Sequence, residues 1–410
     1  MGKNVLIFAD GTGNEGGLLP DESRTNVYKL YAATRTGPDS IINPSQQVAF
    51  YVPGIGTPAP FHNSLWERTK DTIQQSVGLG LTKKIVDCYV AIISVWQPGD
   101  RIYLFGFSRG AYTVRCVAHV LEACGIPTAQ PGQKSLNLDP KFLRKIAGEA
   151  VRTLFTFGMP IRSDAIAQEK ANAYRKTYSS KVGPENDACA YMVGIWDAVA
   201  AVGWQRIFPD WAYDRHFAKG VRYARHLQSI DEGRSDFKRV SWGGSGTVLS
   251  PPRENEPEQF EQIWFAGNHA DVGGSYPENE SRLSDITLSW MIDFVTDKIP
   301  EANRVLVNPH LLRLYPSSAG MMHDECFVGI AGTNLKWKRA VRDVPHDAVL
   351  HDTVYERLEM PEVRNFTSYP PRSETTTKPK HTSVRPNECS LRPSEPSVRR
   401  IDHEPASGQL

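Results

Sequence analysis

Short apolar runs, each closed by turn residues, recur along the first 300 residues of the chain. The runs are nearly continuous rather than alternating, which is typical of strands buried on both faces of a parallel sheet. Predicted strands cover 4–10, 47–52, 101–107, 188–197 and the segment that starts at 261, and segments with helical spacing cover 79–97, 109–124, 165–178 and 282–299. This alternation predicts right-handed crossovers and an α/β fold with a doubly wound, mostly parallel sheet.

The strand and helix pattern predicts one domain over residues 1–360, interrupted by two long polar or mixed insertions. The insertions, at about 126–187 and 204–257, are expected to form a cap over an edge of the sheet. Residues 365–410 are rich in Pro, Ser, Thr and charged residues and lack apolar periodicity, so they are predicted to form a disordered tail.

Composition excludes few classes of protein. Formal net charge is +1 over 410 residues, so a broad nucleic-acid-binding surface is not expected. The six cysteines form no CxxC pair and are interpreted as reduced core residues. No signal peptide precedes the first predicted strand, and the apolar runs are too short for a transmembrane segment. We expect a cytoplasmic protein, or one exported without a cleaved signal. Peripheral contact with a membrane is compatible with either. The oligomeric state is not indicated.

A serine stands where the predicted strand 101–107 meets the predicted helix 109–124. Ser108 is flanked by Gly106 and Gly110, which gives the pattern G-x-S-x-G. On a sharp strand-to-helix turn this pattern predicts a nucleophile elbow, with the serine hydroxyl exposed above the sheet edge. The backbone N–H of Arg109 would then point to an oxyanion, aided by the helix N-terminus. The alternative is a tight packing turn with an incidental serine.

A nucleophilic serine needs a histidine base and an acid that orients the base. Asp197 closes one predicted strand and Asp271 follows a later one, which is the usual position of the acid in this arrangement. His351 begins a helix-like segment late in the domain and fits the last member of a triad. His269, two residues before Asp271, could instead serve as the base with Asp197 as its partner, or could be a structural histidine. His310 and His323 lie in a poorly patterned region and are interpreted as surface residues.

Other polar residues at predicted strand ends allow further interpretations. Asp10 opens the turn "DGTG", whose Gly11-Thr12 backbone could supply a second oxyanion donor, or whose aspartate could form a local turn. Arg109 could attract an anionic substrate or pair with an acid of the cap. The block "HLQSIDEGR" (226–234) could bind a polar head group or form a solvated helix end.

Two rival functions use the same residues. Asp10, Asp197, His269 and Asp271 could hold a divalent metal for phosphoester hydrolysis, although no HExxH or calcium-loop spacing is present. The chain could also be a binding module that keeps the fold without turnover.

Seven colinear blocks resemble an uncharacterised α/β-hydrolase domain family that includes the catalytic domain of type VI secretion phospholipase effectors. The blocks are "FADGTGN" (8–14), "YVPGIGT" (51–57), "GDRIYLFGFSRGAYTVR" (99–115), "VGIWDAVAAVG" (193–203), "ARHLQSIDEGRSDF" (224–237), "WFAGNHADVGGSY" (264–276) and "LHDTVYERL" (350–358). The resemblance implies a lipase or phospholipase-type serine esterase without a cofactor, acting on an ester or phospholipid. It implies Ser108 as nucleophile, His351 as base, and Asp271 or Asp197 as acid.

Overall fold

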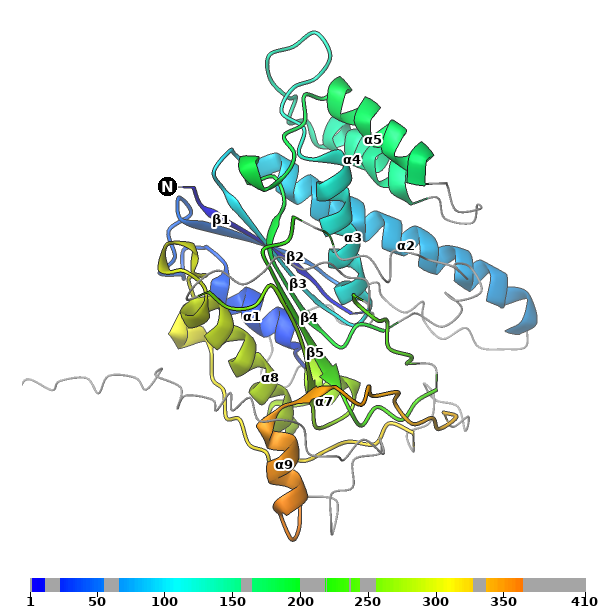
Figure 1. Cartoon of the computed structure of the whole chain (residues 1–410), viewed down its shortest axis with the longest axis vertical. Helices are drawn as coiled ribbons and strands as arrows, with labels where there is room; N and C mark the ends of the chain where they lie inside the picture. Colours follow the sequence, from blue (N-terminus) through cyan, green and yellow to red (C-terminus); the bar gives the residue numbers. More distant parts are fainter. Residues whose placement is uncertain are drawn as a thin grey trace, which may run out of the picture.

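Within the residues that the structure describes, seven parallel strands form one sheet at the centre of the molecule, in the order β2-β1-β3-β4-β5-β6-β7 (Figure 1). The structure is a computed structural model that describes residues 2–11, 23–54, 66–155, 164–199, 218, 220–235, 237–243, 256–326 and 337–363. For residues 66–79 it describes the backbone alone. The strands are β1 (Asn4–Ala9), β2 (Gln47–Val52), β3 (Arg101–Phe107), β4 (Ala190–Trp196), β5 (Tyr223–Ser229), β6 (Phe260–Phe265) and β7 (Val349–Leu350). The predicted doubly wound α/β fold is confirmed.

Helices cover both faces of the sheet. They are α1 (Asn26–Thr34), α2 (Trp66–Val95), α3 (Arg109–Cys124), α4 (Pro140–Leu154), α5 (Asp164–Thr177), α7 (His269–Gly273), α8 (Arg282–Asp293), which continues into a π-helical turn (Phe294–Lys298), and α9 (Asp352–Glu359). Single 3-10 turns lie at Pro184–Asn186, Glu278–Glu280, Glu301–Asn303 and Pro309–Leu311. None of these helices, among the described residues, is long and apolar enough to cross a membrane.

Continuous apolar strands are explained by the two cores that they separate. In β1, Val5 and Ile7 point into a core shared with α2, α3, α4 and α5. Leu6 and Phe8 point to the other face, into a core shared with α1 and α8. Because successive side chains of a strand face opposite sides, a strand buried on both faces needs apolar residues at every position.

The strand order places the predicted site residues at one edge of the sheet. From β1 the chain goes to β2 on one side and then crosses to β3 on the other, so the topology switches direction between β1 and β3. In open α/β sheets, ligands bind outside the carboxyl ends of the strands at such a switch point. Asp10 follows β1, Ser108 follows β3 and Asp197 follows β4 at this edge.

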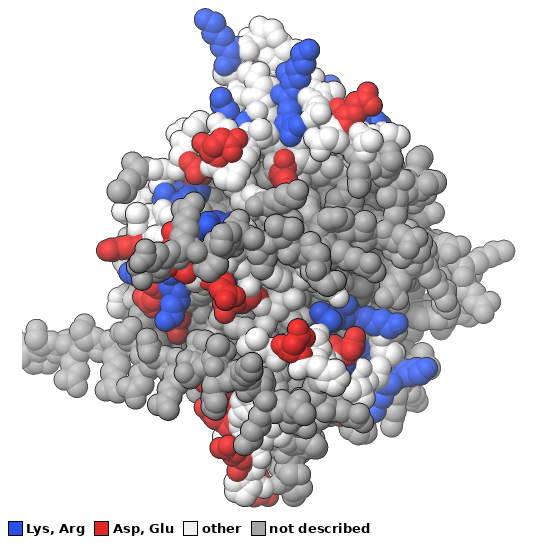
Figure 2. Space-filling model, viewed as in Figure 1, with Lys and Arg blue, Asp and Glu red and all other residues white. Residues whose placement is uncertain are grey.

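The predicted insertions differ in how much of them the structure describes. Residues 126–187 include α4 and α5, which pack on α2 and α3 and lie at the opposite end of the molecule from α9 (Figure 1). Most of 204–257, the predicted tail 365–410 and Thr12 lie outside the described residues. On the face shown in Figure 2, basic and acidic side chains are interspersed over the described surface.

Candidate active site

Ser108 occupies a strained turn between β3 and α3. Its backbone has φ 57° and ψ −124°, a conformation that residues other than glycine rarely adopt. Such strain persists only where the surroundings enforce it, and it clusters at functional sites. The Ser108 N–H donates to the Trp196 carbonyl of the neighbouring strand β4 at 3.1 Å, which fixes the turn. The Ser108 side chain makes no capping hydrogen bond to the N–H groups of the first turn of α3.

The two glycines of the elbow are required by close approaches of the main chain. A Cβ atom on Gly106 would lie 2.5 Å from the carbonyl oxygen of Gly110. A Cβ atom on Gly110 would lie 2.0 Å from the carbonyl oxygen of Ala9, at the end of β1. These distances are far inside van der Waals contact, so the turn can form in this place only with glycine at both positions.

Asp197 lies directly after β4, next to the elbow, and its carboxylate is fully enclosed. Oδ2 accepts from His269 Nδ1 at 2.6 Å, and Oδ1 accepts from the Ser229 N–H at 3.0 Å. Arg342 donates to both oxygens, at 2.7 and 3.0 Å. Burial alone would raise the pKa of Asp197, but the Arg342 guanidinium and the bond to His269 outweigh it and hold this pKa below its usual range.

His269 is the first residue of α7 and is buried beside the elbow. Its ring lies 4.5 Å from the Phe107 ring and 5.2 Å from the Phe237 ring, between centroids. Its backbone N–H donates to Glu232 at 3.2 Å. Burial lowers the pKa of His269 even though Asp197 acts in the other direction, so the neutral ring is favoured. With Asp197 ionised, Nδ1 carries the proton and Nε2 keeps its lone pair, for which the described residues supply no hydrogen-bond donor.

Asp271 is occupied in a different pair. Its Oδ2 accepts from the Asn268 N–H at 3.0 Å and completes a capping box at the start of α7. Its Oδ1 contacts His323 Nδ1 at 2.7 Å, and His323 Nε2 lies 3.2 Å from Glu280. Burial lowers the pKa of His323, but these two carboxylates raise it above its usual value. His323, which was interpreted from the sequence as a surface residue, is instead half-buried, bridges two acids and has no ring nitrogen free for a substrate.

His351 caps α9 and makes no contact with either candidate acid among the described residues. Its Nδ1 accepts from the Thr353 N–H at 3.3 Å and lies 2.9 Å from the Thr353 hydroxyl. The ring stacks on Phe265 with centroids 4.5 Å apart, and burial lowers the pKa of His351 to about 4. Because Nδ1 accepts the backbone N–H, the neutral ring carries its proton on Nε2.

Asp10 forms a local turn at the end of β1. Its carboxylate accepts from the Gly11 N–H at 2.7 Å, from the Thr25 hydroxyl at 2.5 Å and from the Tyr51 hydroxyl at 2.7 Å. Burial raises the pKa of Asp10 to about 6 against these hydrogen bonds. Its backbone oxygen accepts from the Lys84 ammonium at 2.7 Å. The Gly11 N–H is thus bound to Asp10, as expected for the turn interpretation.

Arg109 is the first residue of α3, directly after Ser108. In the part of the chain that the structure describes, no hydrogen bond or ion pair joins its guanidinium to another group. Burial lowers its pKa to about 10. The guanidinium lies near enough to Lys84 to disfavour the charge on that lysine. A partly desolvated pair of cations beside the elbow attracts an anion.

The block 226–234 is not a helix end. Residues 223–229 form strand β5, and every residue of this strand is buried. His226 Nδ1 contacts Gln262 at 3.1 Å, and its Nε2 accepts from the Ala198 N–H at 3.3 Å. The expectation of a solvated helix end was wrong because hydrogen bonds from neighbouring strands satisfy these polar side chains within the sheet.

The proposed metal ligands do not converge. Among the described residues, no group of three or more His, Cys, Asp or Glu side chains is arranged to hold a metal ion. Asp10 binds hydroxyl groups, Asp197 binds an arginine, and Asp271 binds a histidine.

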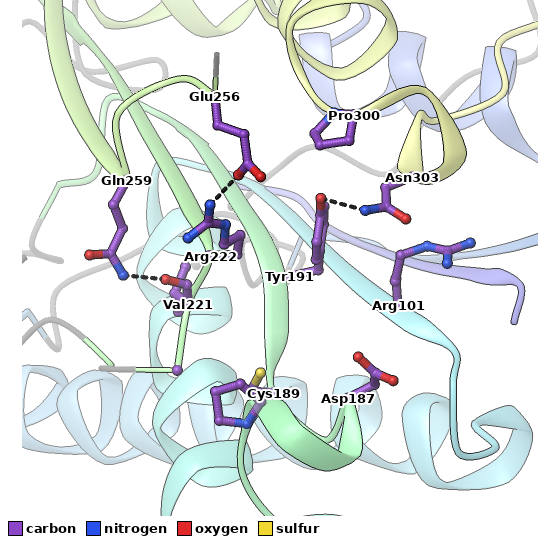
Figure 3. Close-up of a pocket in the computed structure, with 12 residues that line it drawn as sticks. Arg101, Asp187, Cys189, Tyr191, Val221, Arg222, Glu256, Gln259, Pro300 and Asn303 are labelled. Atoms are coloured by element: carbon purple, nitrogen blue, oxygen red, sulfur yellow. Dashed lines mark hydrogen bonds and ion pairs between the residues drawn. The ribbon is translucent and has the colours of Figure 1, made fainter. Parts of the chain in front are cut away.

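The cavity drawn in Figure 3 lies at the other edge of the sheet. It measures about 320 Å³ and is lined by residues at strand starts, among them Arg101, Tyr191 and Arg222. Strand β3 has seven residues, so Arg101 is about 20 Å from the elbow. Two pairs of polar groups in this cavity bind each other: Arg222 pairs with Glu256, and Asn303 donates to the Tyr191 hydroxyl at 2.8 Å.

The chain is similar to proteins of both eukaryotic and bacterial origin. It is 28% identical over 298 residues to the uncharacterized protein YEL023C of Saccharomyces cerevisiae, covering 70% of this chain and 38% of that protein. A crystal structure of an uncharacterized protein from Pseudomonas aeruginosa matches 77% of this chain and 48% of that one, at 18% identity and TM-score 0.41. The structure of the Tle1 effector bound to the VgrG spike of the type 6 secretion system matches 69% of this chain and 52% of that one, at 16% identity and TM-score 0.30. The chain thus spans about half or less of the length of these relatives.

A family model identifies the family. The model for the catalytic domain of Tle1-like phospholipase effectors of type VI secretion matches residues 3–294, from β1 to the end of α8. Arg342 and His351 lie beyond the matched residues. The match confirms the resemblance expected from the sequence blocks: the chain belongs to the Tle1-like phospholipase effector catalytic domain family of type VI secretion.

Proposed function

We propose that this chain hydrolyses acyl esters of the phospholipid class, with Ser108 as nucleophile, His269 as general base and Asp197 as the acid that orients it. The observation that carries the proposal is the 2.6 Å contact between His269 Nδ1 and Asp197 beside a strained serine turn. Family membership supports the reaction class. Asp271 with His351, the pairing preferred from the sequence, has less support because each binds a different partner.

In the first half of the reaction, the Ser108 hydroxyl oxygen attacks the ester carbonyl carbon. The hydroxyl proton passes to Nε2 of His269, which is free to accept it because Nδ1–H is directed at Asp197. Asp197 stays ionised and stabilises the imidazolium that forms. The tetrahedral oxyanion is held by the backbone N–H of Arg109 and the N-terminus of α3, to which the Ser108 side chain makes no capping hydrogen bond.

In the second half, the intermediate collapses and the alcohol leaves with the proton from His269. Water, deprotonated by the same histidine, then attacks the acyl-enzyme carbonyl and releases the fatty acid. A phospholipid also carries a phosphate, and the Arg109 guanidinium with nearby Lys84 offers it a positive site. A substrate of this kind would bring the chain into peripheral contact with a lipid surface.

The test uses purified protein with phospholipid vesicles and a series of p-nitrophenyl esters. Wild type should release fatty acid, and Ser108→Ala should lose on the order of 10⁶-fold in kcat, as for other serine triads. A fluorophosphonate probe should label wild type at Ser108 and leave Ser108→Ala unlabelled. Ser94→Ala, a half-buried serine in α2 bonded to the Ala91 carbonyl at 2.8 Å, is the matched control and should behave as wild type.

Three outcomes would overturn the proposal. Equal turnover by wild type and Ser108→Ala would exclude a serine esterase. Turnover that a chelator abolishes, without labelling of Ser108, would favour the metal phosphoesterase. Lipid binding without turnover or labelling would favour a binding module.

A further inference from the structure

Arg342 contacts both oxygens of the proposed acid, and it comes from a distant part of the chain. It lies in an irregular segment that docks on the loop after β5, where the Ala340 N–H donates to the Gly233 carbonyl at 2.9 Å. Its side chain is 4% exposed, and Asp197 is 0% exposed. The family match ends at 294, so this contact is made by a segment outside the matched residues.

The geometry of the contact uses every acceptor site of the carboxylate. Each oxygen of Asp197 takes one N–H of Arg342 and one further donor: Oδ1 the Ser229 N–H, and Oδ2 the His269 ring. Arg342 also donates to the Phe237 carbonyl at 3.1 Å, and the Phe237 ring packs edge-on against His269. A two-pronged arginine contact fixes the plane of a carboxylate, which a single bond does not.

We propose that Arg342 is a positioning residue for the Asp197–His269 pair. By holding the plane of the carboxylate, it directs Oδ2 at His269 Nδ1 and so turns Nε2 toward Ser108; by its charge, it keeps the pair from taking up a proton. The catalytic part of this role rests on the proposed function. The effect of Arg342 on the titration of the His269 ring can be measured without turnover.

Other charged groups face the pair and set the background against which Arg342 acts. Around His269, Asp197 and Glu232 favour the protonated ring, and Arg234 disfavours it. Glu232 is itself paired with Arg234 at 2.8 Å. Around Asp197, more distant charge comes from Arg239, and buried His226 lies within electrostatic range. Arg342 is the cation in direct contact with the carboxylate, so its removal changes the field at the pair most.

The sign of the effect follows from charge. Without Arg342, the Asp197–His269 pair loses a neighbouring positive charge and binds a proton more readily, whichever of the two sites takes it. We expect Arg342→Gln to move the acid limb of the kcat/KM profile up by about one pH unit, within the usual effect of a close charge. Misalignment of the base should also lower kcat/KM at its plateau by about 10- to 100-fold. Arg342→Lys keeps the charge but loses the two-pronged contact. The acid limb of its kcat/KM profile should stay in place, while kcat/KM at the plateau should still fall.

The experiment compares wild type, Arg342→Gln and Arg342→Lys, with Arg225→Gln as matched control. Arg225 is also a buried arginine paired with a carboxylate, Glu261 at 2.9 Å, but it lies toward the amino end of β5. Arg225→Gln should lose stability without moving the pH limb. In a second arm, NMR titration of the His269 ring is run in the Ser108→Ala background, where Arg342→Gln should shift the midpoint upward.

The two arms separate failure of this inference from failure of the proposed function. If wild type hydrolyses no ester but the His269 midpoint still moves with Arg342, the positioning role stands and the esterase proposal fails. If Arg342→Gln lowers only the melting temperature, with the pH limb and the His269 midpoint unchanged, Arg342 is merely structural and the inference is wrong.

Discussion

At the scale of single residues, the decisive difference between the two candidate bases is which ring nitrogen is free. His269 directs Nδ1–H at a carboxylate, which leaves the Nε2 lone pair available. His351 uses its Nδ1 lone pair to accept the Thr353 N–H, so its Nε2 carries a proton and cannot accept one. A general base needs the first arrangement.

We therefore expect His269→Gln and His351→Gln to differ sharply. His269→Gln should lower kcat by about 10⁴-fold or more, because it removes the base. His351→Gln should keep kcat within about tenfold and cost some stability, because it weakens the cap of α9. Ester hydrolysis and thermal unfolding of both variants check this, and the reverse ranking of kcat would restore the Asp271–His351 pairing.

The buried position of His269 also predicts the pH dependence of wild type. Burial lowers the pKa of His269, so its neutral, active form persists below the ordinary histidine value of about 6.5. The activity should rise with pH through a midpoint below that value and be level near pH 7. The kcat/KM profile of a soluble ester measures it. A midpoint well above 6.5 would mean that Asp197 outweighs burial and that the ring is charged at neutral pH.

At the scale of elements, the elbow depends on the packing of β1 against the first turn of α3. Gly110→Ala would place a methyl group 2.0 Å from the Ala9 carbonyl oxygen, so β1 or α3 must move. We expect a loss of unfolding free energy of about 3 kcal/mol or more, with activity lost as well. Gly148→Ala in α4 is the control: its methyl group would meet only the flexible end of Arg152 at 3.1 Å, and stability should be unchanged or slightly higher. Urea unfolding distinguishes the two, and equal stability of both variants would contradict the packing explanation.

Elements with local signals could be predicted from the sequence, and those stabilised by distant partners could not. The elbow was predicted because an apolar strand, two glycines and an amphipathic helix are all contiguous. Strand β5 was missed because its polar residues, such as Arg225, are matched by side chains of β6 more than thirty residues away. At 269–273, where α7 forms, no helix was predicted, although Asn268 and Asp271 have the spacing of a capping box.

The candidate site divides in the same way. Asp197, His269 and Ser108 stood out because each follows a strand at one sheet edge. Their pairing was not evident, since it depends on which side chains the sheet brings into contact. Arg342 carried no signal: it lies in an unpatterned segment and becomes significant only through its contact with a residue 145 positions earlier. His323, expected at the surface, likewise gains its role from Asp271 and Glu280.

At the scale of the whole molecule, burial of a carboxylate at the sheet edge that holds the site lowers the free energy of unfolding at neutral pH. Asp10 is buried at the end of β1, and burial raises its pKa to about 6 from an ordinary value of 3.8. Below pH 3.8 the carboxyl is protonated in both the folded and the unfolded chain, so it does not bias folding. As the pH rises toward 6, the unfolded chain releases the proton first, and folding loses stability. By pH 7 the loss reaches about 3 kcal/mol.

Asp10→Asn removes this titration while keeping a side chain that can accept the Gly11 N–H. The unfolding free energy of the variant, relative to wild type, should therefore increase between pH 4 and pH 7 by about 2.4 kcal/mol. Asp39→Asn is the control of opposite sign. Asp39 is exposed and bonded to Arg35, which lowers its pKa, so the unfolding free energy of this variant, relative to wild type, should decrease as the pH rises. Urea titrations at several pH values measure both trends. A constant difference between Asp10→Asn and wild type would show that Asp10 is ionised at no cost, and that its three hydrogen bonds fully offset its burial.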